Sequence, residues 1–378
     1  MIETAGSFLL YVASFLAVLT VIIYVHELGH YWVARWNGVR VDTFSLGFGP
    51  ELAGWTNRHG TRWKISAIPL GGYVKFFGDA SAISNPDEAL ARMTPAERAG
   101  SLHHKNVWQR SAVVAAGPAA NFLFAIVVFA AIFMFFGRAY TPPVIGTVVA
   151  GSAAEQGGLR DGDRVLSIDG SSIAQFEDLR IVVALHAETP LALVVERAGQ
   201  RVNLTVTPRR VDVPDGFGGS QRMGQLGITG GRPEFVKHDA LSAVWYGVRE
   251  TGSVIVTNLT YIKRIVTGAE SGDQLSGPIG IAKISGDVAR LQPLALIALM
   301  ATLSVAIGFV NLFPIPMLDG GHLLFYAVEA IRGRPLGERA QEYGFRIGLT
   351  VVLSLFLFAT WNDLNRLQVI SVVAGWFS

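Results

Sequence analysis

The sequence predicts a polytopic α-helical membrane protein with four transmembrane helices, a membrane-associated β-hairpin region and an inserted α+β domain. The 378 residues are 51% hydrophobic and 16% charged, with a mean hydropathy of +0.40. Four long apolar stretches are candidates for helices that cross the hydrocarbon core. Between the second and third stretch lies a segment of alternating apolar and polar residues with Gly-rich turns, the pattern of a folded water-soluble domain.

Composition argues against several other classes of protein. The net charge of +2 is too small, and the basic residues are too scattered, to indicate a nucleic-acid partner. The absence of cysteine excludes disulfides and thiolate metal ligands, so any metal must bind nitrogen and oxygen atoms. The N-terminus has neither a basic n-region nor an A-x-A cleavage site, and we therefore expect its apolar stretch to be a retained span.

The first segment, residues 1–37, carries the motif on which the functional prediction rests. His26 and His30 lie four residues apart inside an apolar stretch, and on a helix that spacing puts both imidazoles on one face. Two such histidines supply two of the three protein ligands of a catalytic zinc site. Glu27 adds a carboxylate that can accept a proton from a metal-activated water without being a ligand.

A histidine in an apolar helix is often a structural residue, and the HExxH pattern also arises by chance. The surroundings favour a functional interpretation, because no charged residue stands between Glu3 and His26. Ionisable groups are costly inside the hydrocarbon region, where they usually have a function. Three of them at metal-ligand spacing therefore predict a metal site.

Residues 38–110 are predicted as a β region followed by a loop. Alternating segments at 41–49 and 63–75, broken by Gly and Pro, predict short strands or hairpins close to the first span. Residues 79–110 predict a polar loop with helical pieces. The second span, 111–137, carries Asn121 after a Gly-Pro pair, and a buried amide there can either tie helices together or take part in the chemistry.

The inserted domain is predicted at residues 142–208. Around a stretch of helical spacing that begins at Phe176, the sequence has four strand-like runs: 144–149, 165–168, 191–197 and 202–207. Residues 209–292 are predicted as a Gly-rich linker or loosely packed extension, mainly 209–234, followed by an amphipathic helix at 240–266. Charges in the middle and at the end of this helix favour a position on the membrane surface over a further span.

The third span lies within residues 293–330 and runs into Asn311-Leu312-Phe313-Pro314-Ile315-Pro316-Met317-Leu318-Asp319-Gly320-Gly321-His322. Two prolines and paired glycines break a helix at membrane depth, which is tolerated only where the freed backbone lines a cavity. Asp319 needs a partner there, and a zinc ion held by the two histidines of the first span would be one. Two alternatives are that Asp319 merely caps the next helix and that His322 is the ligand.

The expected topology follows from the charges on the short loops, because Lys and Arg accumulate on the cytoplasmic side. Residues 35–110 hold ten Lys and Arg against six Asp and Glu. The loop at 331–346, which leads to the last span and tail at 347–378, is also basic in balance. We therefore expect both loops in the cytoplasm, the inserted domain on the opposite side, and the metal site in the cytoplasmic half of the bilayer.

The two separated motifs together resemble the site-2 protease family of M50-type intramembrane zinc metalloproteases, and within it the bacterial regulator-of-sigma-E (RseP-type) proteases. The order of the four spans and Gly277-Pro278-Ile279-Gly280 resemble that family as well. The inserted domain, with Gly146-Thr147-Val148 and Gly157-Gly158-Leu159, resembles a PDZ domain. Many RseP-type proteins carry two tandem PDZ domains, whereas this sequence has room for one.

The resemblance implies roles for individual residues. His26, His30 and Asp319 would be the ligands of Zn²⁺, the one cofactor, and Glu27 would be the general base. Asn311 would hold the substrate backbone.

Two further segments would contact substrate. Gly146, Thr147 and Val148 would do so in the PDZ domain, and the strand-like 63–76 region would pair with an extended substrate in the membrane. Strand pairing makes physical sense, because a transmembrane helix must unwind before its peptide bonds can be attacked, and a new strand replaces the lost hydrogen bonds.

The implied function is zinc-dependent cleavage of transmembrane segments of single-span proteins in the bacterial inner membrane, after a first cut by a site-1-type protease. Anti-sigma factors and signal-peptide remnants are the substrates that the resemblance suggests, membrane lipid surrounds the spans, and the PDZ domain would face the periplasm. Two other classes of function compete with it. A zinc transporter would need internal repeats and several metal-facing polar spans, and a PDZ scaffold would leave the HExxH motif without a role.

Overall fold

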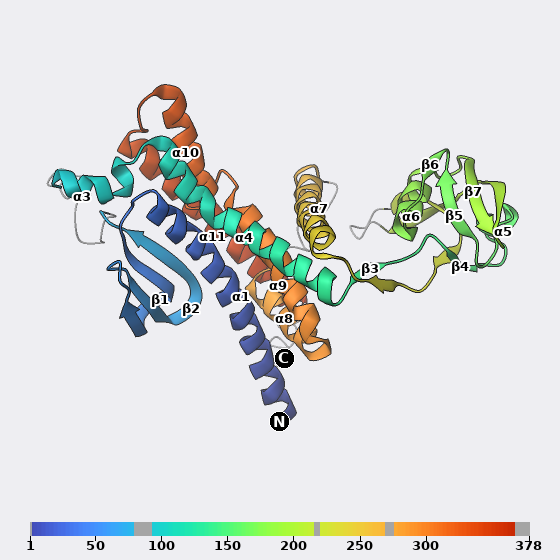
Figure 1. The fold of residues 1–378 in the computed structure, drawn as a ribbon, viewed down its shortest axis with the longest axis horizontal. Coiled ribbons are helices and arrows are strands. Elements are labelled where there is room, and N and C mark those ends of the chain that lie inside the picture. Colours follow the sequence, from blue (N-terminus) through green and yellow to red (C-terminus); the bar gives the residue numbers. More distant parts are fainter. Residues whose placement is uncertain (1, 79–92, 215–219, 269–275, 367–378) are drawn as a thin grey trace, which may run out of the picture. The chain divides into compact units, whose positions relative to one another are not determined.

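The computed structural model describes residues 2–78, 93–214, 220–268 and 276–366. The chain divides into two compact units, which are described separately. Unit 1 consists of Met1–Phe129, Val244–Lys263 and Gly272–Ser378, and unit 2 consists of Ala130–Ala243 and Arg264–Ser271. Figure 1 labels many of the elements of both units, and the labels follow the order of the chain.

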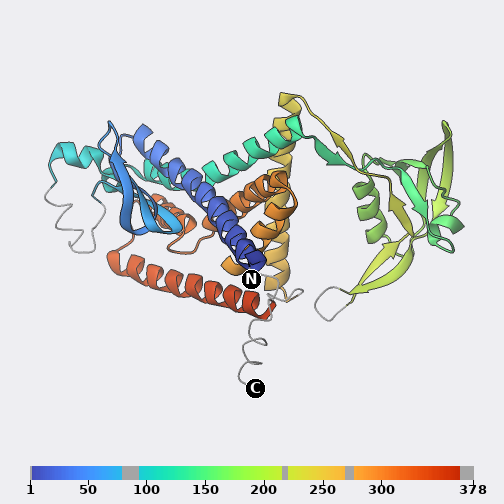
Figure 2. The same ribbon diagram turned by 90° about the horizontal axis from the view of Figure 1, so that it is seen from below.

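Unit 1 is built on long apolar helices. Within the described ranges, four helices are long and apolar enough to cross a membrane: α1 (Ile2–Trp36), α4 (Val107–Phe135), α9 (Pro293–Asn311) and α11 (Glu338–Arg366). They agree in number and place with the four predicted spans. The last helix begins well before residue 347, so most of the predicted loop at 331–346 is helical; Figure 2 shows α11 as one continuous helix. The C-terminal tail lies outside the described residues.

A twisted hairpin packs beside α1. Its strands are β1 (Val41–Thr56) and β2 (Arg62–Phe76), longer than the short strands that the sequence predicts. Both strands fold back at glycines with positive φ, Gly47 in β1 and Gly71 in β2. The segment Gly72–Phe76 therefore pairs with the first half of β1 on one side only and forms an edge of the sheet.

Aromatic packing fixes the hairpin to α1. Phe44 stacks on Trp63 with ring centroids 4.1 Å apart, and Tyr31 of α1 meets both rings edge-on. Phe44 and Tyr31 are almost completely buried. Such aromatic pairs contribute beyond the area that they bury, so the position of β2 relative to α1 is set by side-chain packing as well as by chain connection.

Among the described residues of unit 1, the predicted helical pieces within 79–110 are α3 (Pro95–Gly100) and the 3₁₀ helix η1 (Leu102–His104). Three longer helices also belong wholly or mostly to this unit. The amphipathic helix predicted at 240–266 is present as α7 (Ala240–Val266), and it is not among the four candidate spans. The prediction for 209–292 misses a second helix in that range, α8 (Pro278–Leu291). This helix packs along α1, where Tyr11 donates a hydrogen bond to Asp287. A short helix, α10 (Asp319–Arg332), follows α9 after a broken turn.

Unit 2 contains an antiparallel four-stranded sheet with two helices. The sheet order is β6-β5-β7-β8, formed by Ser171–Ser172, Arg164–Ile168, Leu191–Arg197 and Gln200–Val206. Helix α6 (Phe176–Leu185) covers the core at the place where the sequence has helical spacing, and α5 (Ala153–Gln156) adds one turn. The inward-facing side chains of these elements form one apolar cluster.

The predicted linker at 209–234 is wrong, because this part of the chain forms strands. A hairpin of β9 (Arg209–Pro214) and β10 (Ser220–Gln225) is followed by β11 (Ile228–Gly230) and β12 (Glu234–Val236). Strand β11 pairs with β4 (Ile145–Val148), and β12 pairs with β3 (Arg138–Tyr140). Leu226 is 2% exposed within the core cluster, so the domain does not close at residue 208.

Asp363, near the end of α11, caps the N-terminus of α8 by accepting hydrogen bonds from its backbone. Its side chain is buried, and its two oxygens accept hydrogen bonds from the N–H groups of Gly277 at 3.1 Å and Gly280 at 2.8 Å. A Cβ on either glycine would lie within 2.8 Å of this carboxylate. The backbone of the Gly-Pro-Ile-Gly sequence thus binds the carboxylate of Asp363, a buried acid on another helix.

Replacing Asp363 with Ala is expected to lower the thermal unfolding temperature of the detergent-solubilised protein. The buried N–H group of Gly277 and the partly buried one of Gly280 would lose their acceptor, which costs about 1–3 kcal/mol for a fully buried group. Glu342→Ala, at an exposed site on the same helix, is the matched control and should change the midpoint little. Equal midpoints for the two variants would contradict the assigned role.

Candidate active site

Two parts of unit 1 that are far apart in the sequence meet at a partly buried polar cluster of His26, His30 and Asp319. One ligand atom from each residue lies within 4.8 Å of the others. His26 Nε2 is 3.2 Å from His30 Nε2, and Asp319 Oδ2 is 3.1 Å from His26 Nε2. Asp319 Oδ1 is 3.6 Å from His30 Nε2. The structure therefore brings together the three residues that were predicted as metal ligands.

Close packing of α1 against α4 shapes the histidine side of the cluster. A Cβ on Gly29 would lie 2.2 Å from the carbonyl oxygen of Ala116, so only glycine allows α1 to approach α4 this closely. A Cβ on Gly117 would lie 2.3 Å from His30 Nε2. Glycine on each helix thus gives the two imidazoles room to point at the same spot.

The broken turn after α9 presents Asp319. Met317 has φ of 90°, a conformation that a side chain with a Cβ rarely adopts, and such backbone is usually held in place by its surroundings. The N-cap of α10 is Leu318, and Asp319 is its first residue. The carboxylate of Asp319 faces the histidines, so the alternative in which it merely caps the helix does not describe the structure.

A second layer of contacts orients the imidazoles. His30 Nδ1 lies 2.8 Å from the carbonyl oxygen of Val113, which can only accept a hydrogen bond. The proton of His30 is therefore on Nδ1, and the lone pair of Nε2 points into the cluster. His26 Nδ1 lies 3.3 Å from the side-chain amide of Asn121, a fully buried residue of α4.

The side-chain amide of Asn121 can hold the His26 imidazole in the same tautomer, with its proton on Nδ1. Its Oδ1 is buried without a hydrogen-bond partner, while Nδ2 faces the ring. Because the two ends of an amide are distinguished only by their contacts, rotating the group by 180° puts Oδ1 on a protonated Nδ1. Both histidines then direct an Nε2 lone pair inward. Asn121 also accepts a hydrogen bond from Ser304 through its backbone carbonyl, so it ties α4 to α9 as well.

The residues present fit a bound zinc ion. Two Nε2 atoms and a carboxylate face one another, and Asp319 Oδ2 is a buried oxygen without a hydrogen-bond partner. In a tetrahedral site with zinc–ligand bonds near 2.0–2.1 Å, neighbouring ligand atoms are roughly 3.3 Å apart. The observed separations of 3.1–3.6 Å match that spacing. Two imidazoles and a carboxylate are also a donor set that catalytic zinc sites use.

The cluster opens into a pocket of about 810 Å³. Glu27 lines this pocket, together with Gly72, Tyr73 and Val74 from the edge of the hairpin. A Cβ on Gly72 would lie 3.2 Å from Glu27 Cγ, so the edge strand passes directly beside this carboxyl group. Asn311, the last residue of α9, is also in the lining.

Two other predicted residues or segments have different surroundings. His322 lines the pocket but is not part of the metal-ligand cluster, and its ring lies 5.5 Å from that of Phe345. Gly146, Thr147 and Val148 belong to β4 of unit 2. The N–H group of Thr147 donates to Thr229, and that of Val148 donates to Asp161. Both donors therefore already have partners inside the domain.

Comparison with known proteins decides between the competing classes of function. Residues 14–355 match the model of Peptidase family M50. The chain belongs to this family. A relative from Agrobacterium fabrum that is named as a zinc metalloprotease is 50% identical to this chain, over 94% of the chain and 96% of the relative. The M50 chain described here is therefore a zinc metalloprotease of the site-2 type, and zinc is its cofactor.

Other relatives extend over the same length. Metalloprotease MmpA of Caulobacter vibrioides is 43% identical over 98% of this chain and 99% of its own. A zinc metalloprotease homologue of Rickettsia conorii is 33% identical over 95% of this M50 chain and 99% of its own. The resemblance that the sequence motifs suggest is thus confirmed at the level of the family, and the transporter and scaffold interpretations lose their support.

Replacing Asn121 with Ala is expected to weaken zinc binding about 10- to 100-fold, the usual effect of removing a group that orients a metal-ligating histidine. The measurement is competition with a chromophoric chelator. Thr302→Ala, which removes a hydroxyl bonded to the carbonyl of Ala298 within α9, is the control and should leave the affinity unchanged. Parent-like affinity in Asn121→Ala would show that the amide does not orient His26.

Proposed function

We propose that this M50 protease hydrolyses transmembrane segments of single-span proteins, with His26, His30 and Asp319 as zinc ligands and Glu27 as the general base. The convergence of the three ligand atoms within 4.8 Å carries the proposal. Glu27 lines the same pocket and is not one of the three. When bound, zinc supplies Lewis acidity, which polarises a peptide carbonyl and makes water more acidic.

Glu27 moves the proton in this proposal. Its carboxylate takes a proton from the attacking water and then gives it to the nitrogen of the leaving amine, which keeps the charges balanced across the two steps. The residue follows His26 directly on α1, so the base is fixed by the same helix that positions the ligands. The edge strand passes beside Glu27 at Gly72, so the Glu27 carboxylate lies next to the strand along which a substrate would bind.

The substrate is proposed to bind as an added strand along Gly72–Phe76. This segment is hydrogen-bonded to β1 on one side, and Gly72, Tyr73, Val74 and Phe76 line the active-site pocket. A helix that unwinds in the membrane exposes its peptide groups, and an unpaired strand edge can satisfy them. Asn311 lies in the same lining and offers a side-chain amide to hold the substrate backbone.

Unit 2 is proposed to be a single PDZ domain that filters substrates. This proposal is supported by the architecture of unit 2: a small antiparallel sheet with two helices surrounds one core, and the unit is inserted between two spans. Because the Thr147 and Val148 donors of β4 have partners, β11 offers a better edge for a peptide. Among the described strands it pairs with β4 alone, and Gly230 at its end lies against Phe176 of α6.

Such a filter places this protease second in a sequence of cuts. A site-1-type protease would first remove the extramembrane part of a substrate, and the shortened product would then pass the PDZ domain. Anti-sigma factors and signal-peptide remnants have the single apolar span that this pathway needs. The basic balance of residues 35–110 supports a bacterial inner-membrane topology with unit 2 in the periplasm and the site in the cytoplasmic half of the surrounding lipid bilayer.

Two variants at the metal site separate the base from the ligands. Glu27→Gln should retain stoichiometric zinc but lose cleavage of a model membrane substrate by 10²-fold or more, roughly the contribution of general-base catalysis. Asp319→Ala should lose zinc itself, as measured by metal analysis of the purified protein. His322→Ala is the matched control and should keep its zinc. Turnover by Glu27→Gln, or full zinc in Asp319→Ala, would contradict the assignments.

Removing the body of unit 2 tests the filter. Tyr140 of β3 is paired with Glu234 of β12, so residues 141–233 can be replaced by an Asn-Gly turn that closes these two strands as a hairpin. The shortened protease is expected to cleave a full-length substrate as fast as one already cut, because nothing would then exclude the bulky form. The same deletion with Glu27→Gln shows whether any cleavage comes from this site. Unchanged preference for the shortened substrate would rule out filtering by unit 2.

A further inference from the structure

An ion pair lies at the end of the active-site pocket away from the metal ligands. Arg110, in the first turn of α4, is paired with Glu329, in the last turn of α10. Their side chains are only 14% and 17% exposed, and both line the pocket. The guanidinium carbon of Arg110 also lies 4.8 Å from the ring centroid of Tyr326, one turn earlier on α10.

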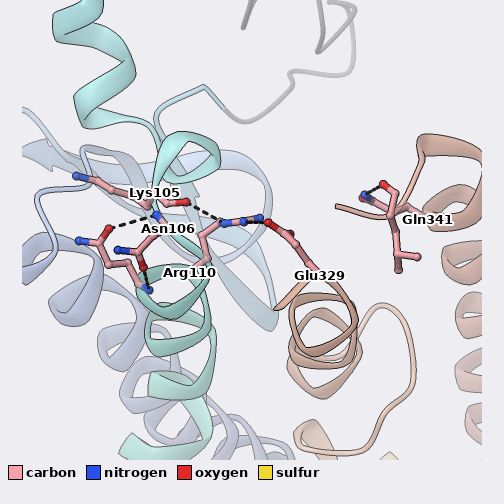
Figure 3. A network of polar contacts seen from close by, with 7 residues as sticks. Lys105, Asn106, Arg110, Glu329 and Gln341 are labelled. Atoms are coloured by element: carbon pink, nitrogen blue, oxygen red, sulfur yellow. Dashed lines mark hydrogen bonds and ion pairs between the residues drawn. The ribbon is translucent and has the colours of Figure 1, made fainter. Parts of the chain in front are cut away.

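Arg110 is itself held firmly at the start of α4. Its Nε donates to the carbonyl of Lys105 at 3.1 Å. Asn106 and Gln109 exchange hydrogen bonds between side chain and backbone, which caps the helix start just before it. Figure 3 shows Arg110 reaching from this capped turn to Glu329. These contacts fix the position of the Arg110 guanidinium, and its ion pair in turn fixes the position of Glu329.

The same two helices carry the parts of the metal site. Along α4, Val113 and Asn121 contact the imidazoles of His30 and His26. Along α10, Asp319 stands at the first residue, and Glu329 is ten residues further on, a distance of about 15 Å along a helix. Helix α4 thus contacts both histidine ligands directly and contacts the helix of the third ligand through Arg110.

We propose that Arg110 and Glu329 are positioning residues that set the direction of the Asp319 carboxylate at the zinc site. The inference rests on the proposed assignment of His26, His30 and Asp319 as the ligands. Asp319 follows a broken turn with no side-chain cap, so the tilt of α10 determines where its carboxylate points. The ion pair fixes that tilt against α4, the helix that also orients the histidines. Neither residue touches the reacting atoms in this role.

The test uses the full-length protease in detergent and measures zinc affinity by chelator competition and the visible absorption of the cobalt-substituted protein. The variants are Glu329→Gln, Arg110→Gln and the double variant. Glu342→Gln is the matched control, because it removes the same charge from an exposed pair with Arg346. We expect zinc affinity about 10- to 100-fold weaker in all three pair variants, with a changed cobalt spectrum and parent values for the control.

The double variant and the thermal midpoint make the outcome unambiguous. Parent-like zinc affinity in the double variant would show that the single changes act through an unpaired charge, and it would overturn the inference. A lower melting temperature with parent-like affinity and cobalt spectrum would show a purely structural pair and would overturn it as well. Asp319→Ala is measured alongside: if it keeps zinc, the ligand assignment fails, whereas if it alone loses zinc, only the present inference fails.

Discussion

The mutual approach of His26, His30 and Asp319 inside apolar helices is the constraint on which the rest of unit 1 depends. Two imidazole nitrogens with lone pairs and a carboxylate, 3.1–3.6 Å apart, are stable in a low-dielectric surrounding only with a cation or shared protons between them. The approach also requires α1 and α4 to pack closer than ordinary side chains permit, which Gly29 and Gly117 allow. The convergence of the three side chains therefore depends on the close packing of α1 against α4.

The chemistry of a membrane peptidase explains why a β-hairpin lies beside that arrangement. Peptide groups in a helix are already hydrogen-bonded, and in lipid they have no water to replace those bonds. An enzyme that attacks them must supply both water and alternative backbone partners. In the proposed function, the pocket that Glu27 lines would admit the water, and the edge segment Gly72–Phe76 would provide the backbone partners. The aromatic packing of Phe44, Tyr31 and Trp63 holds the hairpin against α1, the helix that carries His26 and His30.

The sequence predicts the four apolar helices and the three residues that converge in the cluster, because their signals are local or chemically unusual. His26 and His30 share a helix face, and Asp319 is an acid in a broken apolar stretch. The interpretation of residues 209–234 as a linker is wrong because β11 and β12 have three residues each and pair with strands about 80 and 95 residues earlier in the chain. The contact of Asn121 with His26 likewise joins segments 95 residues apart. Such pairings leave no periodic pattern, whereas the amphipathic helix α8 does have a helical period, which the prediction for 209–292 misses.

Polar contacts near helix ends contribute more to the positions of the helices in unit 1 than they would in a water-soluble protein. The hydrophobic effect does not drive apolar helices together in lipid, so packing of small residues and hydrogen bonds must set their positions. Asp363 fixes α11 to the start of α8, and Arg110 at the start of α4 holds the end of α10. His30 similarly reaches the backbone of α4. Two of these three contacts lie outside the cluster of His26, His30 and Asp319, and each of the two joins a pair of helices in unit 1.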